Sequence, residues 1–181
     1  RQHLELTRNL AERFNFHYSP TFTVPEPFIP KVGAKIMSLQ EPEKKMSKSD
    51  ANDKATVFLI DSDDVIMSKI KRAVTDSGTN IVYDAEKRPG VANLMTIHHI
   101  TTGKSIAEIQ SDFDGLGYAE FKEAVGEALV AFIRPVRERY TALRSDEESL
   151  KATLKSGAEH ARDRARKVLR KVYKKTGFVE L

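Results

Sequence analysis

The five residues Lys45-Met46-Ser47-Lys48-Ser49 place two lysines and two serines in one short polar segment. Lysine ammonium groups are compact charges that suit phosphate oxygens, and flanking hydroxyls and backbone N–H groups can complete a cradle for an anion. The spacing of Lys45 and Lys48 lets both side chains reach one polyphosphate from a single loop. Lysine-rich surface loops without a ligand are common, so composition alone leaves both interpretations open.

A second candidate site lies near the end of the chain. Residues 151–181 hold ten Lys or Arg against three acidic residues, although the net charge of the whole chain is only +4. Four of these basic residues recur at four-residue steps and would form a slowly drifting stripe on one helix: Arg162, Arg166, Arg170 and Lys174. Such a stripe can follow an RNA backbone, and it can equally be a plain solvated face.

The lysine segment lies within a stretch, residues 1–60, that is predicted to be a piece of mixed α/β structure. Apolar spacing favours a helix over residues 1–14, and residues 21–24, Thr-Phe-Thr-Val, are typical of a short strand. Three further segments lack a helical period: residues 31–38 (strand or turn), 40–54 (the loop that carries the lysines) and 56–60 (strand or buried turn).

Residues 61–181 are predicted to form an antiparallel helical bundle. Helices are expected after the cap residues 61–63, from Pro89 onward, over 118–143 with a kink or break at Pro135, and over 157–175, ending before Gly177. Three capping boxes should mark helix starts: Ser105 with Glu108, Ser145 with Glu148, and Ser156 with Glu159.

Composition restricts the class of protein. The 181 residues are 40% hydrophobic and 31% charged, which allows a buried core. The absence of cysteine excludes disulfides and thiolate metal sites. His98 and His99 lie on consecutive helix positions and cannot share a face, and Asp61, Asp63 and Asp64 are interpreted as residues that cap a helix. No protein-bound metal is therefore expected. No apolar run approaches the roughly 20 residues that span a bilayer, and a cytoplasmic protein without a membrane partner is expected.

The lysine segment is, without any substitution, the KMSKS motif of class I aminoacyl-tRNA synthetases. Four more blocks extend the likeness: residues 2–15, 30–39, 71–77 and 89–94. Together they resemble the tryptophanyl-tRNA synthetases of bacteria over essentially the whole chain. The tyrosine enzymes share the fold, but Ala-Val-Thr-Asp-Ser and the Pro-Gly block followed by Asn-Leu favour the tryptophan family.

The resemblance implies an α/β remnant of a Rossmann-like catalytic domain (residues 1–60), followed by an all-α anticodon-binding domain (residues 61–181), mostly helical overall. It implies activation of tryptophan with Mg·ATP and transfer to tRNA(Trp), by a homodimeric intact enzyme. Lys48 and Lys45 would be catalytic. The ATP-binding residues would be Ile36, Lys45, Met46, Ser47, Lys48 and Ser49, and the basic stripe Arg162, Arg166, Arg170 and Lys174 would contact tRNA.

Two departures from the family pattern matter. Ala51 stands where many relatives have proline after the Ser-Asp that follows the motif, which would loosen the exit of the loop. The His-x-Gly-His type motif and the tryptophan pocket of the family's N-terminal half are absent from this sequence. The chain is therefore predicted to be a C-terminal fragment that cannot form the adenylate alone. A stand-alone tRNA-binding helical module and a generic helical domain with an accidental lysine loop are the alternatives.

Overall fold

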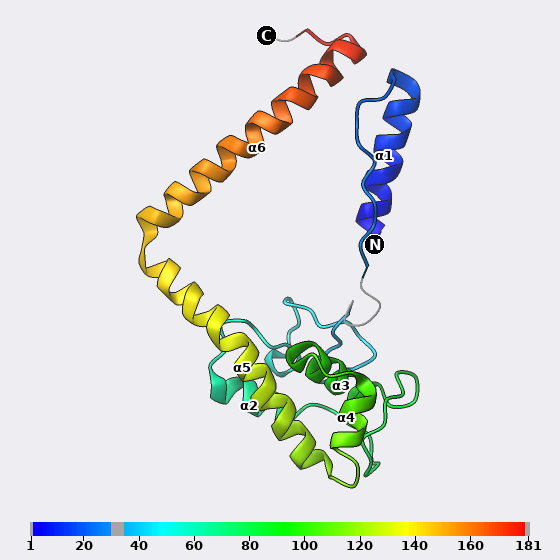
Figure 1. Ribbon diagram of the computed structural model, residues 1–181, viewed down its shortest axis with the longest axis vertical. Coiled ribbons are helices and arrows are strands. Elements are labelled where there is room, and N and C mark those ends of the chain that lie inside the picture. The colour runs from blue at the N-terminus through cyan, green and yellow to red at the C-terminus, as the bar shows by residue number, and fades with distance from the viewer. Residues whose placement is uncertain (1, 30–34, 180–181) are drawn as a thin grey trace. The chain divides into compact units, whose positions relative to one another are not determined.

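The computed structural model describes residues 2–29 and 35–179, and within them the chain is mostly helical (Figure 1). The helices are α1 (Gln2–Tyr18), α2 (Asp63–Lys71), α3 (Pro89–Thr102), α4 (Ile106–Asp112), α5 (Tyr118–Ser145) and α6 (Glu147–Thr176), with a single 3₁₀ turn, η1 (Asp53–Ala55). Part of the predicted segment 31–38 lies outside the described residues.

The chain divides into two compact units. The central unit comprises residues 30–142, and the terminal unit joins residues 1–29 to residues 143–181. This division differs from the predicted boundary at residues 60 and 61, which remains a prediction about the intact protein. Helix α6 belongs to the terminal unit, and the predicted bundle of residues 61–181 likewise stays a prediction.

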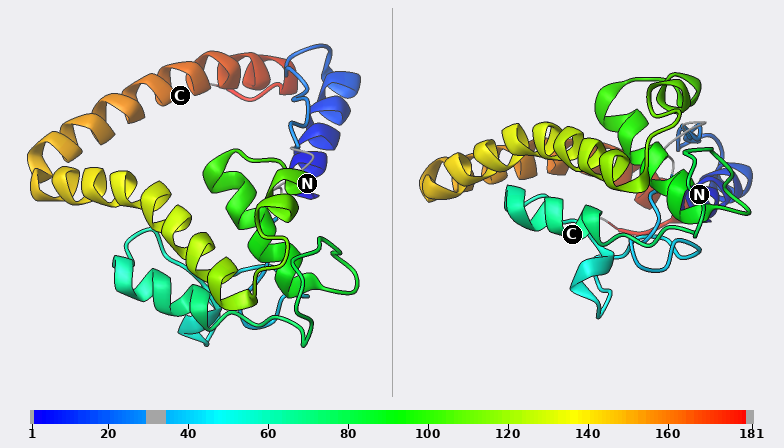
Figure 2. Two further views of the ribbon diagram at one scale, coloured as in Figure 1. Left: turned by 60° about the horizontal axis from the view of Figure 1, so that its bottom comes forward. Right: turned by 90° about the horizontal axis from the view of Figure 1, so that it is seen from below.

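Helix α3 forms the middle of the central unit. Every residue from Gly90 to His98 is buried, so the helix has no solvated face over that stretch. Helix α4 contacts α3, and α2 lies beside α5 in all three views (Figures 1 and 2). Their fully buried side chains include Ile66 and Ile70 from α2, Ile109 from α4, and Phe121 and Val125 from α5. A helix buried on all sides is typical of the centre of a helical core.

Local capping chemistry explains several helix starts. The Ser62 side chain accepts from the Val65 N–H, and Ser105 forms a complete capping box with Glu108, which confirms both predicted starts. The other two predicted boxes are wrong. Asp146 caps α6 by accepting from the Ser149 N–H, and Ser156 lies inside α6, because the good helix formers before it carry the helix through.

Helix α5 continues through Pro135, so of the kink or break predicted there, the break does not occur. Proline removes the hydrogen bond that would reach the carbonyl of Ala131, four residues earlier. Ala131 is exposed, so water can satisfy its carbonyl. The predicted C-terminus of α6 is confirmed: Gly177 adopts the left-handed conformation (φ 80°) and its N–H donates to the carbonyl of Tyr173.

The short strand predicted at residues 21–24 does not form, and of the strand or buried turn predicted at residues 56–60, the strand does not form. The side chain of Asn15 instead accepts from both the Thr21 and Phe22 N–H groups, each at 2.8 Å, so these donors have no strand partner. Residues 56–60 are irregular and lead into a turn. Pairing within the described residues is limited to one antiparallel bridge, between Met37 and Lys45. A strand needs a neighbouring strand for its ladder, and these segments have none here.

In the terminal unit, α6 is anchored at its C-terminal end. The Lys175 ammonium donates to the Pro20 carbonyl (2.8 Å) and to Thr21 Oγ1 (2.6 Å), just beyond the end of α1. No described residue of α6 is buried. A helix that is polar over most of its surface gains little from packing, so intrinsic helix propensity and side-chain ion pairs contribute more to it.

Candidate nucleotide-binding loop

Residues 36–46 form a small hairpin that carries the start of the KMSKS motif. The Met46 N–H donates to the Ile36 carbonyl (3.0 Å), and the Ser38 N–H donates to the Lys44 carbonyl (2.9 Å). A turn closes the hairpin, with the Lys44 N–H bonded to the Glu41 carbonyl at 2.8 Å. Ile36 and Met46, two residues predicted to contact ATP, are therefore hydrogen-bonded neighbours although ten positions separate them.

The two faces of this hairpin differ. Met46 is half-buried and packs against the core with Ile36 and Val57, whereas Lys45 is exposed. This alternation follows from extended backbone, where successive side chains point to opposite sides. Ile36 and Met46 also line an open apolar hollow of about 190 Å³ with residues of α3 and α5. The motif is thus seated on the core by its methionine while its lysine faces solvent.

Lys48 lies at the second position of a reverse turn. The Asp50 N–H donates to the Ser47 carbonyl at 3.2 Å, which closes a turn over residues 47–50. The hydroxyls of Ser47 and Ser49 lie 3.1 Å apart, and the Ser49 N–H lies 3.4 Å from Ser47 Oγ. The turn therefore gathers both motif serines beside Lys48, as an anion site would require.

The three neighbouring lysines have different electrostatic surroundings. Lys44 forms an ion pair with Glu41, and the hydrogen bond to that carboxylate raises the pKa of Lys44. The ammonium groups of Lys45 and Lys48 make neither an ion pair nor a hydrogen bond with any residue that the structure describes. Lys45 and Lys48 are consequently the two cations of the segment that remain available to an anionic ligand.

A buried asparagine of α3 fixes the other edge of the hairpin. Asn93 accepts from the Met37 N–H (2.8 Å) and donates to the Met37 carbonyl (2.9 Å), as a neighbouring strand would. The hairpin is also bonded to the loop after α2, since the Val74 N–H donates to the Leu39 carbonyl at 2.7 Å. Helix α3 therefore positions the lysine loop directly through a side chain.

The start of α3 fits closely against the same loop. An added Cβ on Gly90 would lie 2.2 Å from the Val74 carbonyl oxygen, so only glycine allows this approach. Three of the sequence blocks that carry the family likeness meet here through Leu39, Val74 and Gly90. They are residues 30–39, 71–77 and 89–94. Together they form the support of the KMSKS hairpin.

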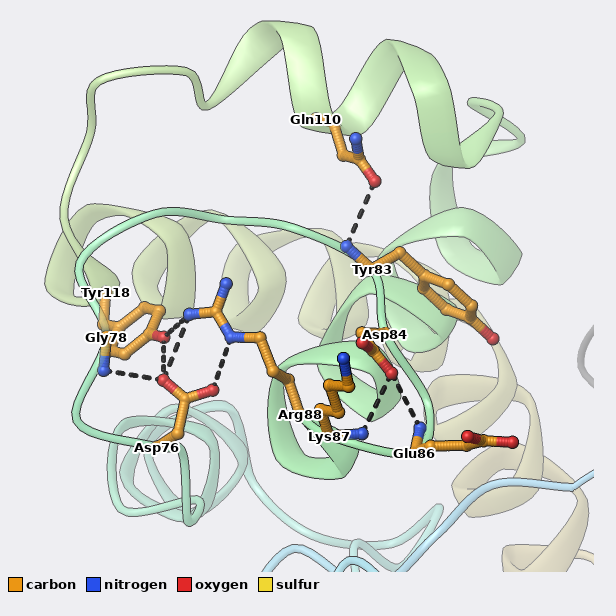
Figure 3. A network of polar contacts seen from close by, with 9 residues as sticks. All are labelled: Asp76, Gly78, Tyr83, Asp84, Glu86, Lys87, Arg88, Gln110 and Tyr118. Carbon is orange, nitrogen blue, oxygen red and sulfur yellow. Dashed lines mark hydrogen bonds and ion pairs between the residues drawn. The ribbon is translucent and has the colours of Figure 1, made fainter.

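A polar network holds the long loop between α2 and α3 (Figure 3). Arg88 donates through Nε to Asp76 at 2.7 Å, the Gly78 N–H donates to the same carboxylate at 2.8 Å, and Tyr118 of α5 also bonds to it. The hydrogen bond from Arg88 holds the pKa of Asp76 well below its usual range, and Asp76 in turn raises the pKa of Arg88. The network ties the residue before α3 to α5.

The basic stripe lies on α6, in the terminal unit. Its four members are all exposed: Arg162, Arg166, Arg170 and Lys174. Each four-residue step turns by about 40° around the helix, so the four side chains form a slowly drifting stripe. Its role in binding tRNA stays a prediction.

Neither metal ligands nor a membrane span emerge from the described part of the chain. Within residues 2–29 and 35–179, no three His, Asp or Glu side chains cluster in a way that could hold a metal ion. No helix among these residues is both long and apolar enough to cross a membrane.

Comparison with known proteins identifies the class. The family model described as "tRNA synthetases class I (W and Y)" matches residues 1–134. The chain therefore belongs to the class I tRNA synthetases of this family, as the KMSKS hairpin indicates. Among the named relatives are tryptophan–tRNA ligases: that of Listeria monocytogenes is 50% identical over 178 residues, and that of Bacillus subtilis is 49% identical.

Solved structures agree with this assignment. Tryptophanyl-tRNA synthetase from Mycoplasma pneumoniae superposes with a TM-score of 0.87 at 30% identity and covers 99% of this chain. The Campylobacter jejuni enzyme, solved with ADP and tryptophan, gives 0.65 at 29% identity over 98% of this chain. The chain spans about half the length of these relatives: 54% of the Listeria protein and 56% of the Mycoplasma chain.

Sequence reasoning missed three residues that organise the site: Asn93, Thr56 and Lys69. All three are polar and buried. Their local sequence does not show which groups they bond to, because those partners lie in other segments of the chain. The available signal was that asparagine and lysine stand among apolar helix positions, where a polar side chain needs a partner.

Proposed function

We propose that this chain is the C-terminal part of a tryptophan–tRNA ligase, which activates tryptophan with ATP and transfers it to tRNA(Trp). The observation that carries the proposal is the KMSKS hairpin, which leaves Lys45 and Lys48 unpaired among the described residues while its backbone is anchored to the core. The similarity to tryptophan–tRNA ligases over nearly the whole chain supports the choice of tryptophan as the amino acid.

The two lysines have a defined role in this reaction. A carboxylate oxygen of tryptophan forms a bond to the α-phosphorus of Mg·ATP, and the bond from that phosphorus to the bridging oxygen of the β-phosphate breaks. The electron pair leaves on pyrophosphate, whose negative charge grows as the bond lengthens. Lys48, with Lys45, stabilises that charge in the transition state. The hydroxyls of Ser47 and Ser49 add hydrogen bonds to the phosphates.

The adenine side uses backbone groups. The Met46 N–H and the Ile36 carbonyl already bond to each other. This pairing holds the two residues side by side, so that a base which contacts the backbone of one can also contact the backbone of the other.

The remainder of the chain completes the enzyme. Residues 1–60 join the Rossmann-like catalytic domain of the intact protein, where their extended segments gain strand partners. Residues 61–181 supply the helical domain that receives the anticodon, with the stripe of α6 contacting the tRNA backbone through Arg162, Arg166, Arg170 and Lys174. The intact ligase acts as a homodimer in the cytoplasm.

The test uses the full-length ligase that contains this sequence and measures tryptophan-dependent pyrophosphate exchange. Lys48→Ala should lower kcat by about 100-fold or more, because a group that stabilises transition-state charge is lost. Lys44→Ala is the matched control, since it removes the same charge from the same loop but from a lysine already paired with Glu41. It should change kcat by less than about twofold.

Two results would contradict the proposal. Equal losses in Lys48→Ala and Lys44→Ala would mean that the loop contributes only general charge. A full-length protein that binds tRNA(Trp) but never exchanges pyrophosphate would instead be a tRNA-binding module.

A further inference from the structure

A buried lysine stands behind the KMSKS loop. Lys69 of α2 is 8% exposed, and its ammonium lies 2.7 Å from Oδ2 of Asp61. Only 10% of the Lys69 side chain and 14% of the Asp61 side chain are exposed. Burying a charge costs free energy unless it is paired and hydrogen-bonded, and an ion pair of this kind is weak evidence for a gain in stability. The placement of this pair therefore calls for an explanation in terms of geometry.

The pair holds the segment that leaves the loop. Besides Asp61, the Lys69 ammonium donates to the Thr56 carbonyl at 2.8 Å and lies 5.1 Å from the centre of the Phe58 ring. Asp61 in turn accepts from the Phe58 N–H at 2.9 Å. Residues 56–61 have no regular secondary structure, so these contacts replace the backbone ladder that would otherwise fix them.

Thr56 carries this anchorage into the motif. It is 6% exposed, and its hydroxyl donates to the Ser47 carbonyl at 2.8 Å. The same carbonyl closes the turn over residues 47–50 by accepting from the Asp50 N–H. Lys48 follows Ser47 directly, so the position of that carbonyl sets where the Lys48 backbone starts. One residue thus links a fixed point in the core to the catalytic lysine.

We propose that Thr56 is a positioning residue for the KMSKS loop, supported by the Lys69–Asp61 pair, and that it holds Lys48 in the geometry needed for amino-acid activation. This inference rests on the proposed function of the loop. A loop that closes over a triphosphate needs a defined resting place, because a displacement of about 1 Å at a charged group costs a large factor in rate. The Thr56 hydroxyl supplies that place without touching ATP.

The test compares two threonines in the full-length ligase. Thr56→Val removes the hydroxyl and keeps the shape of the side chain. Thr96→Val is the matched control: Thr96 is also buried (8% exposed), and its hydroxyl also donates to a carbonyl at 2.8 Å, that of Ala92 within α3. Both substitutions remove one hydrogen bond from a buried threonine hydroxyl to a backbone carbonyl, so both should lower the melting temperature.

Only Thr56→Val should change catalysis. We expect its kcat for tryptophan-dependent pyrophosphate exchange to fall about tenfold, the factor that matches loss of one hydrogen bond in the transition state, with little change in KM for tryptophan. Thr56→Ser, which keeps a hydroxyl, should restore kcat to within about threefold of wild type. Equal kcat in Thr56→Val and Thr96→Val would overturn the inference.

A second measurement does not depend on ligase activity. Hydrogen exchange of the Asp50 amide, which bonds to the Ser47 carbonyl, should be faster in Thr56→Val and unchanged in Thr96→Val. Unchanged exchange in both variants would refute the positioning role even in a protein that proved to have no exchange activity. Absence of activity in the wild-type ligase would refute the proposed function, while faster Asp50 exchange in Thr56→Val would still support the anchorage.

Discussion

Lys45 and Lys48 differ from Lys44 in what surrounds their ammonium groups, and the difference arises over single residues. The acidic residue at the hairpin turn, Glu41, pairs with Lys44. The alternation of extended backbone then turns Lys45 toward solvent and Met46 toward the core. The turn at residues 47–50 presents Lys48 beside two hydroxyls. Three residues of the same type thus differ in their availability to a ligand because the backbone places them in different surroundings.

The burial of a single residue, His98, leads us to predict that the stability of the fold depends on pH. It is buried on α3 against Phe113, and its Nδ1 has no hydrogen-bond partner among the described residues. Burial lowers the pKa of His98 below its ordinary 6.5, and the positive charge of Lys104 lowers it further. The negative charge of Asp112 has a smaller effect in the opposite direction. The unfolded chain therefore binds this proton more readily than the folded one.

Stability due to neutral His98 should be complete above about pH 6.5 and should decline as the pH falls below it. The slope contributed by this one proton is at most about 1.4 kcal/mol per pH unit. Urea unfolding of the chain at several pH values measures it. His98→Leu should flatten the slope, whereas His160→Gln, at an exposed position of α6, should leave it unchanged. An equally steep slope in His98→Leu would assign the effect to other groups.

Between elements, the decisive contacts are those at the start of α3. The helix begins with proline and glycine, which suit its first turn and let the loop at Val74 come close. Further along, Asn93 reaches the hairpin and acts as a strand would. The same helix therefore contributes to the core and supports the KMSKS hairpin.

Gly90→Ala should destabilise the central unit by about 1–3 kcal/mol, because the new methyl group would overlap the Val74 carbonyl. Gly157→Ala is the matched control within α6: nothing lies within 4 Å of its added Cβ. That change should instead stabilise its helix by about 0.5–1 kcal/mol, since alanine loses less backbone freedom than glycine. Chemical denaturation followed by circular dichroism gives both values, and a neutral Gly90→Ala would argue against the close packing.

The stripe of α6 leads to a prediction about salt dependence. In the full-length ligase, Arg162→Gln with Arg166→Gln should weaken tRNA(Trp) binding and lower the slope of log affinity against log salt by about 1–2. Lys151→Gln with Lys155→Gln removes the same charge from the first half of the same helix and is the control. Filter binding at several salt concentrations measures the slopes. Equal slopes for the two double variants would mean that the stripe is an ordinary solvated face.

For the whole molecule, the important fact is that the chain spans about half the length of its relatives. A phosphate loop stabilises charge only when an opposing surface holds the nucleotide and the amino acid. The sequence contains the KMSKS motif and lacks the His-x-Gly-His type motif of the family. Under the proposed function, we expect the part of the relatives that this chain does not match to supply the rest of the active site.

The 181-residue chain alone should therefore show no tryptophan-dependent pyrophosphate exchange, while the full-length ligase should show it. The chain should still fold its central unit, whose core is built from its own residues. Exchange assays on both proteins, with circular dichroism of the isolated chain as the control for folding, test this. Measurable exchange by the isolated chain would mean that its own residues suffice for activation.

The sequence by itself determined the motif, the choice of family, and the helix ends that depend on local chemistry. Ser62, Ser105 and Gly177 act on backbone groups within a few residues, so neighbouring sequence is enough to place them. The start of α6 was placed wrongly because several local capping signals compete there. The strands predicted at residues 21–24 and 56–60 do not form because a strand needs a partner from another segment.

Only the tertiary structure decided which residues hold the loop in place. The pairing of Ile36 with Met46, the reach of Asn93 to Met37, and the link from Lys69 through Thr56 to Ser47 each join segments that are distant along the chain. Such contacts form because burial forces polar groups to find partners wherever the packed core brings them. A polar residue among apolar positions shows locally that a partner is needed, but only the packed molecule decides which partner it finds.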